Sequence, residues 1–300
     1  MNSLDPSALL NDPLAALRDC IAAFLATDLE NTLGLQPHEP AWEEFLVGAA
    51  RGDDPLFLSL KTAVGPFHWT PAEFFALYFP ELSAEPQEIA VISWVLPQRG
   101  PVRMDHRKAV NRPSERWSRS RHYGELCNKA LRTHVAKSLT RTGFPAASPW
   151  DSPQWKRFLN TPRGLASSWS ERHNAFVCGL GTFGLSDGLI TEKGKAVRLG
   201  SVVARLPVPQ AKRPYGDDFH AYCLHYSHGS CSACMKRCPK GAISENGHDK
   251  NACQAFIAEV TRPFVKNRQL GFEVSSCGLC QVGVPCEEGI PVPGKAERPE

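Results

Sequence analysis

Apolar residues recur at helical and strand-like spacings along the first hundred residues. Residues 14–25 place them three and four positions apart, which predicts an amphipathic helix. Thr70 before Pro71 is typical of a helix start, because threonine caps well and proline tolerates the first helical position. Residues 89–96 form a short β-branched apolar run that ends at Pro97, which predicts a buried strand.

The remaining pattern predicts further helices and strands that are interrupted by glycine and proline. These elements are two helices and two strands, at residues 123–139, 171–178, 188–191 and 197–206. A glycine cluster at 179–184 follows the second helix, and three prolines between 207 and 214 favour a linker. We therefore expect an α+β fold with two domains, residues 1–207 and 208–300.

Hydropathy argues against membrane association. The chain has 300 residues, of which 42% are hydrophobic, so it can bury a core. Its strongest apolar run, residues 90–96, is far shorter than the roughly 20 residues of a membrane span. The first residues lack the basic start and the cleavage site of a signal peptide. We expect a cytoplasmic protein that does not contact a membrane.

Charge is unevenly distributed, although the formal net charge is only +3. Residues 1–50 contain eight acids against one arginine, and residues 103–142 contain eleven Lys and Arg against three acids. The basic segment Arg103–Arg141 is compatible with RNA, an anionic substrate or an acidic partner. We favour a charged surface that compensates the acidic first fifty residues. The balanced total does not favour nucleic acid as a partner.

The cysteines are concentrated near the end of the chain, where eight of eleven lie between Cys223 and Cys286. One unit reads C-x2-C-x3-C-P from Cys231 to Pro239, and a second C-x2-C unit precedes Cys286. Eight thiols match two [4Fe–4S] clusters with four ligands each. The predicted ligands are Cys223, Cys231, Cys234, Cys238, Cys253, Cys277, Cys280 and Cys286.

The proline after Cys238 indicates crossed ligation, because in two-cluster ferredoxins this last cysteine of the run ligates the other cluster. We expect one cluster on Cys223, Cys231, Cys234 and Cys286, and another on Cys238, Cys253, Cys277 and Cys280. His228 stands where the usual run has cysteine, so it is an alternative ligand to Cys223. Zinc is also an alternative, since paired C-x2-C units bind it, but C-x3-C-P favours iron and sulfur. Disulfides are disfavoured in a reducing compartment.

A longer pattern connects the glycine cluster with the cysteines. Glu171-Arg172 is followed after six residues by G-L-G-x-x-G, then by a predicted strand, and about forty residues later by C-x2-C-x3-C-P. The order of helix, glycines and strand is not that of a dinucleotide-binding fingerprint. Together with Cys253 and the closing segment CGLCQVGVPC (277–286), the pattern resembles the epoxyqueuosine reductase family, a relative of the reductive dehalogenases.

The resemblance implies a nitroreductase-like, cobalamin-binding N-terminal domain and a ferredoxin-like C-terminal domain with two [4Fe–4S] clusters. Cobalamin would lie between the domains and receive electrons from the clusters. The acid of the family falls at Leu165 here, and its tryptophan and lysine are replaced by Thr182 and Leu185. Because few residues follow the last cysteine, we expect no helical-repeat extension of the kind that the family uses for tRNA. We therefore expect a related reductase with another substrate.

Several residues near the glycines are candidates for holding a cofactor: Arg172, His173, Gly179, Gly181, Gly184 and Asp187. Tyr123 and Asp187 are the candidate catalytic residues. Each also has an ordinary structural interpretation: a tight corner for the glycines, a turn for Asp187, and a salt bridge or buried ring for the Arg-His pair. The three other cysteines, Cys20, Cys127 and Cys178, are expected to be buried apolar residues.

Two functions fit these features. The first is an iron–sulfur oxidoreductase, in which a low-potential ferredoxin or flavodoxin supplies single electrons and two clusters pass them to cobalamin or a small organic substrate. The second is a ferredoxin-like carrier without catalysis of its own, which re-reduces a partner metalloprotein. We favour the enzyme.

Overall fold

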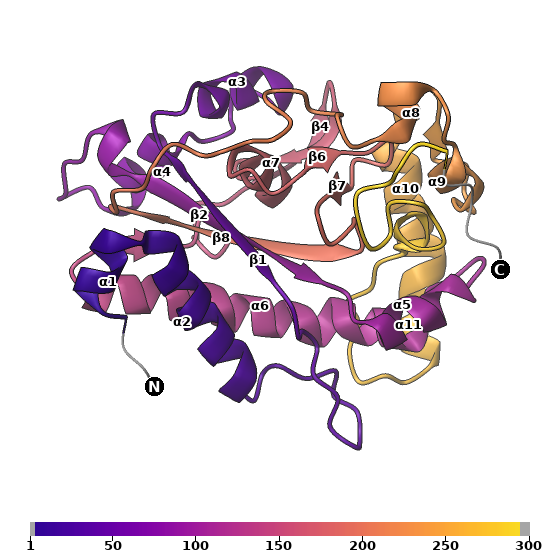
Figure 1. Cartoon of the computed structure of the whole chain (residues 1–300). Helices are drawn as coiled ribbons and strands as arrows, with labels where there is room; N and C mark the ends of the chain where they lie inside the picture. The colour runs from indigo at the N-terminus through magenta and orange to yellow at the C-terminus, as the bar shows by residue number, and fades with distance from the viewer. Residues whose placement is uncertain (1–3, 295–300) are drawn as a thin grey trace.

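A four-stranded antiparallel sheet lies at the centre of the computed structural model, which describes residues 4–294 (Figure 1). The strands occur in the spatial order β1 (Leu46–Arg51), β2 (Ala90–Pro97), β8 (Val197–Ala204) and β3 (Ala146–Ala147). β2 and β8 pair along their whole length, with Ala90 opposite Ala204 and Pro97 opposite Val197. The outermost residues of the two predicted domains, 1–3 and 295–300, lie outside the described residues.

Helices cover both faces of this sheet, because its central strands are apolar on both sides. One face is covered by α1 (Pro6–Asn11), α2 (Pro13–Thr27) and α6 (Glu115–Arg141), and the other by α3 (Pro55–Ala63), α4 (Pro71–Tyr78) and α7 (Glu171–Val177) (Figure 1). Along β2, Ile92 and Trp94 join the first core, whereas Val91 and Val95 join the second. Alternate side chains of β2 point to opposite faces of the sheet, so this one strand contributes to both cores.

The predicted elements of this part are confirmed, with shifted ends. α2 contains the predicted helix, and β2 matches the predicted strand to within one residue. At the start of α4, the Glu73 amide donates to the Thr70 hydroxyl at 3.2 Å, and the Thr70 amide donates to the Glu73 carboxylate at 2.8 Å. This reciprocal capping box fixes the helix start. The short helix η1 (Pro86–Glu88) leads into β2.

The long helix α6 begins eight residues before the predicted start at Tyr123. The Ser114 hydroxyl caps it by accepting from the Trp117 amide at 3.3 Å. The first turns are too polar for apolar spacing to reveal them. Further along, the amide side chain of Asn128 accepts from the Trp94 indole at 2.9 Å and donates to the Leu199 carbonyl at 2.9 Å, which ties α6 to the sheet.

Two short hairpins extend from the sheet toward the C-terminal part. They are β4 (Arg157–Thr161) with β5 (Gly164–Ser167), and β6 (Thr182–Phe183) with β7 (Leu189–Ile190). β7 and β8 confirm the two strands that were predicted around Gly194. The glycine cluster forms the corner between α7 and β6, where a Cβ on Gly181 would lie 2.2 Å from the Ile190 carbonyl oxygen. The glycine is thus required by close backbone packing.

Short elements at one end of the sheet form the C-terminal third (Figure 1, orange and yellow). They are α8 (Leu224–His228), α9 (Ala233–Lys236), β9 (Ile243–Ser244), β10 (Gly247–His248), α10 (Lys250–Phe256), η2 (Ile257–Thr261), α11 (Arg262–Asn267) and η3 (Leu279–Gln281). The buried carboxylate of Glu287 joins them to α5 (Gly100–Arg107) by pairing with Arg103 at 3.3 Å and Arg107 at 2.7 Å. The mixed α and β structure is confirmed, and the boundary at residue 207 stays a prediction.

The basic segment Arg103–Arg141 is compensated from several directions. Arg116 pairs with Glu39 of the acidic first fifty residues at 3.2 Å, as expected, and also with Asp105 at 2.6 Å. Arg103 and Arg107 instead pair with the C-terminal part through Glu287. Within residues 4–294, no helix combines the length and apolar character needed to cross a membrane.

Candidate functional site

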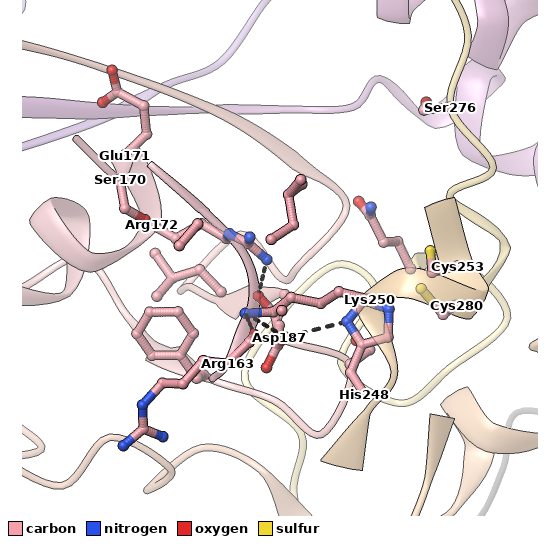
Figure 2. A pocket seen from close by; sticks show the side chains of 18 of the residues that line it. Arg163, Ser170, Glu171, Arg172, Asp187, His248, Lys250, Cys253, Ser276 and Cys280 are labelled. Atoms are coloured by element: carbon pink, nitrogen blue, oxygen red, sulfur yellow. Dashed lines mark hydrogen bonds and ion pairs between the residues drawn. The ribbon is translucent and has the colours of Figure 1, made fainter. Parts of the chain in front are cut away.

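A large cavity lies where the C-terminal elements meet the sheet and its hairpins (Figure 2). Its volume is about 1260 Å³, whereas ordinary small-molecule pockets measure about 300–1,000 Å³. Its walls come from both predicted domains: α6, the β4–β5 hairpin, the start of α7, the β6–β7 turn, β8, and the segments around β10, α10 and η3. The cavity can therefore hold a ligand larger than a typical metabolite.

The eight predicted ligand cysteines gather in two groups. The first group, which consists of Cys223, Cys231, Cys234 and Cys286, lines a small separate cavity. The second group, which consists of Cys238, Cys253, Cys277 and Cys280, lines the large cavity. In Figure 2, Cys253 and Cys280 lie close together on one wall. The two groups have the membership that crossed ligation predicts, and their role as cluster ligands stays a prediction.

Short helices and a tight turn bring these sulfurs together. Cys234 lies on α9 and Cys253 on α10, while Cys277 and Cys280 flank the start of η3. Gly278 between them has a φ of +68°, and a Cβ there would lie 2.1 Å from the Trp117 ring of α6. Only glycine fits this position without strain. The turn that carries two cysteines of the second group is therefore held against α6.

His228 lies away from both cavities. It is exposed at the end of α8, and its Nδ1 lies 2.7 Å from the Ser227 hydroxyl. Cys223, at the start of the same helix, is buried and lines the small cavity. The geometry therefore favours Cys223 over His228 as a member of the first group.

The structure gives one contact that bears on the sulfurs of the second group. Among residues 4–294, no group of three or more His, Cys, Asp or Glu side chains is arranged to hold a metal ion. The Ala242 amide donates to Cys238 Sγ at 3.2 Å, a contact of the kind that tunes cluster sulfurs.

Burial keeps three thiols of the second group, those of Cys253, Cys277 and Cys280, protonated in the absence of metal. Burial is the main cause that raises the pKa of Cys253 to about 11 and that of Cys277 to about 12. It also raises the pKa of Cys280, against the opposing effect of the Lys195 ammonium. Metal binding replaces such protons, so these buried thiols need a cationic centre to ionise near neutral pH.

Asp187 is the centre of a polar network in the wall of the large cavity (Figure 2). It occupies the β6–β7 turn with a φ of +56°, so it is a turn residue that also faces the cavity. Its carboxylate lies 3.2 Å from His248 Nδ1 and 3.7 Å from Lys250 Nζ, and its carbonyl oxygen accepts a hydrogen bond from Arg172. Although burial opposes ionisation, His248, Arg172 and Lys250 lower the pKa of Asp187. It is therefore held as a carboxylate that links the hairpin to β10 and α10.

Glu171, unlike Asp187, is a carboxyl group whose surroundings disfavour ionisation. Both of its carboxylate oxygens are buried, and neither has a hydrogen-bond partner within the described chain. Burial raises the pKa of Glu171 to about 7, although Arg132 acts in the other direction. Arg132 is itself paired with Asp151 at 2.6 Å and Glu125 at 3.1 Å. Glu171 therefore carries a proton for part of the time near neutral pH, which suits an acid–base group.

Cations outnumber acids around the large cavity. The described lining residues include eight Lys and Arg (Arg132, Arg157, Arg163, Arg172, Lys195, Arg198, Lys240 and Lys250) and four acids (Glu125, Glu171, Asp187 and Asp249). Arg198 pairs with Glu125 at 3.4 Å, and its buried Nε has no hydrogen-bond partner in the described chain. Chiefly the charge of Arg198, with burial and Arg157, lowers the pKa of Arg121 to about 10. This excess positive charge favours an anionic ligand.

The other predicted site residues are dispersed. His173 lines the large cavity, and Gly184 lines the small one. Gly179 and Gly181 are not among the described residues that line either cavity, and they pack against backbone as a tight corner requires. Tyr123 lies on α6 outside both cavities, with its ring 5.7 Å from that of Phe272. As expected, Cys20, Cys127 and Cys178 are buried.

His248, Lys250 and Lys195 are among the residues of the site that were not predicted. The first two follow the cysteine run in a polar segment without a recognisable motif. Glu171 was noted only as part of the Glu-Arg pair. Its burial arises from tertiary packing, for which the sequence offers no local signal.

Comparison with known proteins supports the resemblance. No family model matches the chain. Two curated relatives are the epoxyqueuosine reductases of Bacillus anthracis and Bacillus cereus, each 30% identical over 126 residues that cover 40% of this chain and 30% of the relative. The similarity thus spans less than a third of the length of these relatives. The resemblance inferred from the motifs is confirmed.

Several solved structures are similar as well. An epoxyqueuosine reductase with a tyrosine-tRNA stem loop is 17% identical, covering 93% of this chain and 67% of that one with a TM-score of 0.47. An epoxyqueuosine reductase from Bacillus subtilis is 16% identical, covering 85% and 64% with a TM-score of 0.43. A reductive dehalogenase described for B12-dependent dehalogenation is 16% identical, covering 83% and 31% with a TM-score of 0.47.

Proposed function

We propose that this chain is an iron–sulfur oxidoreductase that passes single electrons through two [4Fe–4S] clusters to a ligand in the large cavity. One observation carries the proposal: four of the eight cysteines line a small cavity of their own, and the other four line the large cavity. The two curated relatives, both epoxyqueuosine reductases, support a reductase.

The first and second groups would each hold one cluster, so that the C-terminal part would form a ferredoxin-like domain. When bound, the clusters supply one-electron transfer, which protein side chains do not provide. The residues present fit this role. Each group offers four thiols, and the Ala242 amide already donates to Cys238 Sγ. Burial and such hydrogen bonds are the means by which a protein sets cluster potentials.

The position of the groups suggests the direction of electron flow. The second group lines the large cavity, so it is placed to deliver electrons to a ligand there. The first group would receive them from a low-potential ferredoxin or flavodoxin. A carrier without catalysis would have no use for a cavity of about 1260 Å³ beside its second group. This cavity is the reason we favour an enzyme over an electron carrier.

Cobalamin is the cofactor that we propose for the large cavity. The volume exceeds what a small substrate needs, and the excess of cations suits a ligand that carries a phosphate. The same charge suits an anionic substrate. One similar structure is an epoxyqueuosine reductase with a tRNA stem loop. The balanced charge of the sequence did not favour nucleic acid as a partner. We now include a nucleic-acid substrate in the proposal.

Glu171 is the residue that we propose as proton donor. Leu165, at the acid position of the family, lines the cavity but has no proton to give. Asp187 is held ionised by its neighbours His248, Arg172 and Lys250. Glu171 lines the same cavity without a hydrogen-bond partner in the described chain. Its raised pKa keeps a proton available near neutral pH.

Anaerobic purification followed by metal analysis tests the proposal. We expect about eight irons per chain, broad visible absorption that dithionite bleaches, and tight binding of added cobalamin. Zinc in place of iron would contradict the proposal. A protein that holds both clusters but binds neither cobalamin nor an anionic substrate would instead be an electron carrier.

A further inference from the structure

One cation is buried between the two cysteine groups. Lys195, between β7 and β8, is only 3% exposed. It lines the large cavity with the second group and the small cavity with the first group. Among the described lining residues, no other Lys or Arg belongs to both cavities.

Hydrogen bonds to Cys286 and Ser186 hold Lys195 between the two groups. Its backbone amide donates to the carbonyl oxygen of Cys286, in the first group, at 2.9 Å. Its ammonium donates to the Ser186 hydroxyl at 3.0 Å. The Ser186 side chain in turn lies beside the thiol of Cys280, in the second group. The position of the charge is therefore fixed relative to both sets of sulfurs.

A buried ammonium needs a negative partner, because its desolvation is costly. Within residues 4–294, no carboxylate forms an ion pair with Lys195. Cysteines of both groups surround the ammonium: Cys286, Cys234, Cys280 and Cys223. Once these sulfurs bind a cluster as thiolates, they supply the negative partners that the buried lysine needs.

We propose that Lys195 is a potential-setting cation, which stabilises the reduced state of both iron–sulfur centres. The inference rests on the proposed function, since it requires a cluster on each group. Reduction adds one negative charge to a cluster, and a fixed positive charge nearby attracts it. Screening by water is weak at a buried site, so the attraction is strong. One side chain would thereby raise the potentials of two centres together.

Three variants of the full, cluster-loaded chain test this role. Lys195→Gln removes the charge, and Lys195→Arg keeps it. The matched control is Lys193→Gln, which removes the same charge two residues away, from a side chain that is 43% exposed and pairs with Glu44. The midpoint potential of each centre is measured by anaerobic dithionite titration with electron paramagnetic resonance.

We expect Lys195→Gln to lower both potentials. The expected change is at least tenfold in each reduction equilibrium, about 59 mV for a one-electron couple. Lys195→Arg and Lys193→Gln should leave both potentials near those of the wild type. A Lys195→Gln protein with its full iron content and unshifted potentials would overturn the inference and leave the proposed function intact. A wild-type protein without iron would instead overturn the proposed function.

Ser186→Ala gives a second test if Lys195→Gln does not assemble its clusters. This variant removes the hydroxyl that lies between the ammonium and Cys280. We expect the midpoint potential of the centre on the second group to become more negative, and the potential of the other centre to stay unchanged. Two unchanged potentials in an iron-complete Ser186→Ala protein would contradict the link between Lys195 and that centre.

Discussion

The two cysteine groups differ more in their surroundings than in their own chemistry. The first group shares a small cavity with apolar side chains such as Leu185, Ile190 and Val284. The second group shares a large cavity with Asp187, Glu171 and an excess of cations. Sulfurs that are equivalent in sequence therefore meet different environments. An enclosed centre suits electron relay, whereas a centre beside a charged cavity can serve a ligand.

Substitution of single cysteines should have the largest effect, the loss of a whole cluster, and it tests whether the two groups are separate centres. Cys238→Ser and Cys253→Ser should eliminate the same centre, although Cys238 belongs in sequence with Cys231 and Cys234. Cys234→Ser should eliminate the other centre. Each variant should retain about four of eight irons and lose electron delivery to the cavity. Iron analysis and the resonance spectrum of the surviving centre measure the outcome.

The spectra provide the control for that prediction. Crossed ligation requires that Cys238→Ser and Cys234→Ser leave different surviving signals. Identical signals would mean that the C-x3-C-P run binds one cluster, and the distinction between the two groups would then have to be redrawn.

Glu287→Ala should have the next largest effect and should act on the first group. Glu287 follows Cys286 directly, is 4% exposed, and pairs with Arg103 and Arg107. Loss of one partner from a buried ion pair costs about 3–5 kcal/mol, and the partial exposure of Arg107 places the expected loss at about 3 kcal/mol. Urea unfolding measures it. The exposed Glu192→Ala should change stability by less than about 0.5 kcal/mol, and an equal loss in both variants would contradict the prediction.

Glu171→Gln should have a smaller effect that depends on pH. The folded-state pKa of about 7 lies above the ordinary 4.5, so the folded protein binds the proton more tightly than the unfolded chain. The contribution of the Glu171 carboxyl group to the free energy of unfolding is complete below its ordinary pKa. This contribution is lost as the pH rises through about 7. The glutamine should therefore stabilise the protein by about 1–3 kcal/mol at mildly alkaline pH and by little in acid.

Urea unfolding of wild type and Glu171→Gln at acidic and at alkaline pH measures this difference. The exposed Glu245→Gln serves as control and should show no such trend. A Glu171→Gln effect that is equal at both pH values would show that the carboxyl group is not buried in neutral form. The cavity of the second group would then lack its proposed proton donor.

His228→Ala should have the smallest effect and sharpens the description of the first group. The exposed ring contacts Ser227 and does not line the small cavity. Its removal should leave the iron content unchanged, whereas Cys223→Ser should lose about four irons per chain. Loss of iron in His228→Ala, with iron retained in Cys223→Ser, would contradict the prediction and make His228 the cluster ligand in place of Cys223.

Much of the fold could be predicted, because its signals are local. Apolar spacing located α2, and the β-branched run located β2, since these patterns reflect the faces that each element buries. The proline after Cys238 predicted the membership of both cysteine groups. β1 was missed, because its short apolar run, LVGAA, lies in a segment whose acids dominated the pattern.

The candidate site was less predictable, because its properties arise from residues far apart in the chain. Glu171 has a raised pKa only because packing removes water from its carboxylate. Lys195 lies between the two groups only because its amide meets the carbonyl of Cys286, which is ninety-one residues further along. Neither the raised pKa of Glu171 nor the position of Lys195 could be predicted from the residues that adjoin them in the sequence.

The turn at Gly278 gives the protein an internal optical reporter. It presses against the indole of Trp117, whose Nε1 donates to the Ser276 hydroxyl at 3.2 Å. An inorganic chromophore on Cys277 and Cys280 would sit beside that ring and quench its fluorescence. Filling and emptying of the second group should thus change the contribution of Trp117, one of seven tryptophans, to the ultraviolet emission of the protein, and this needs no attached dye.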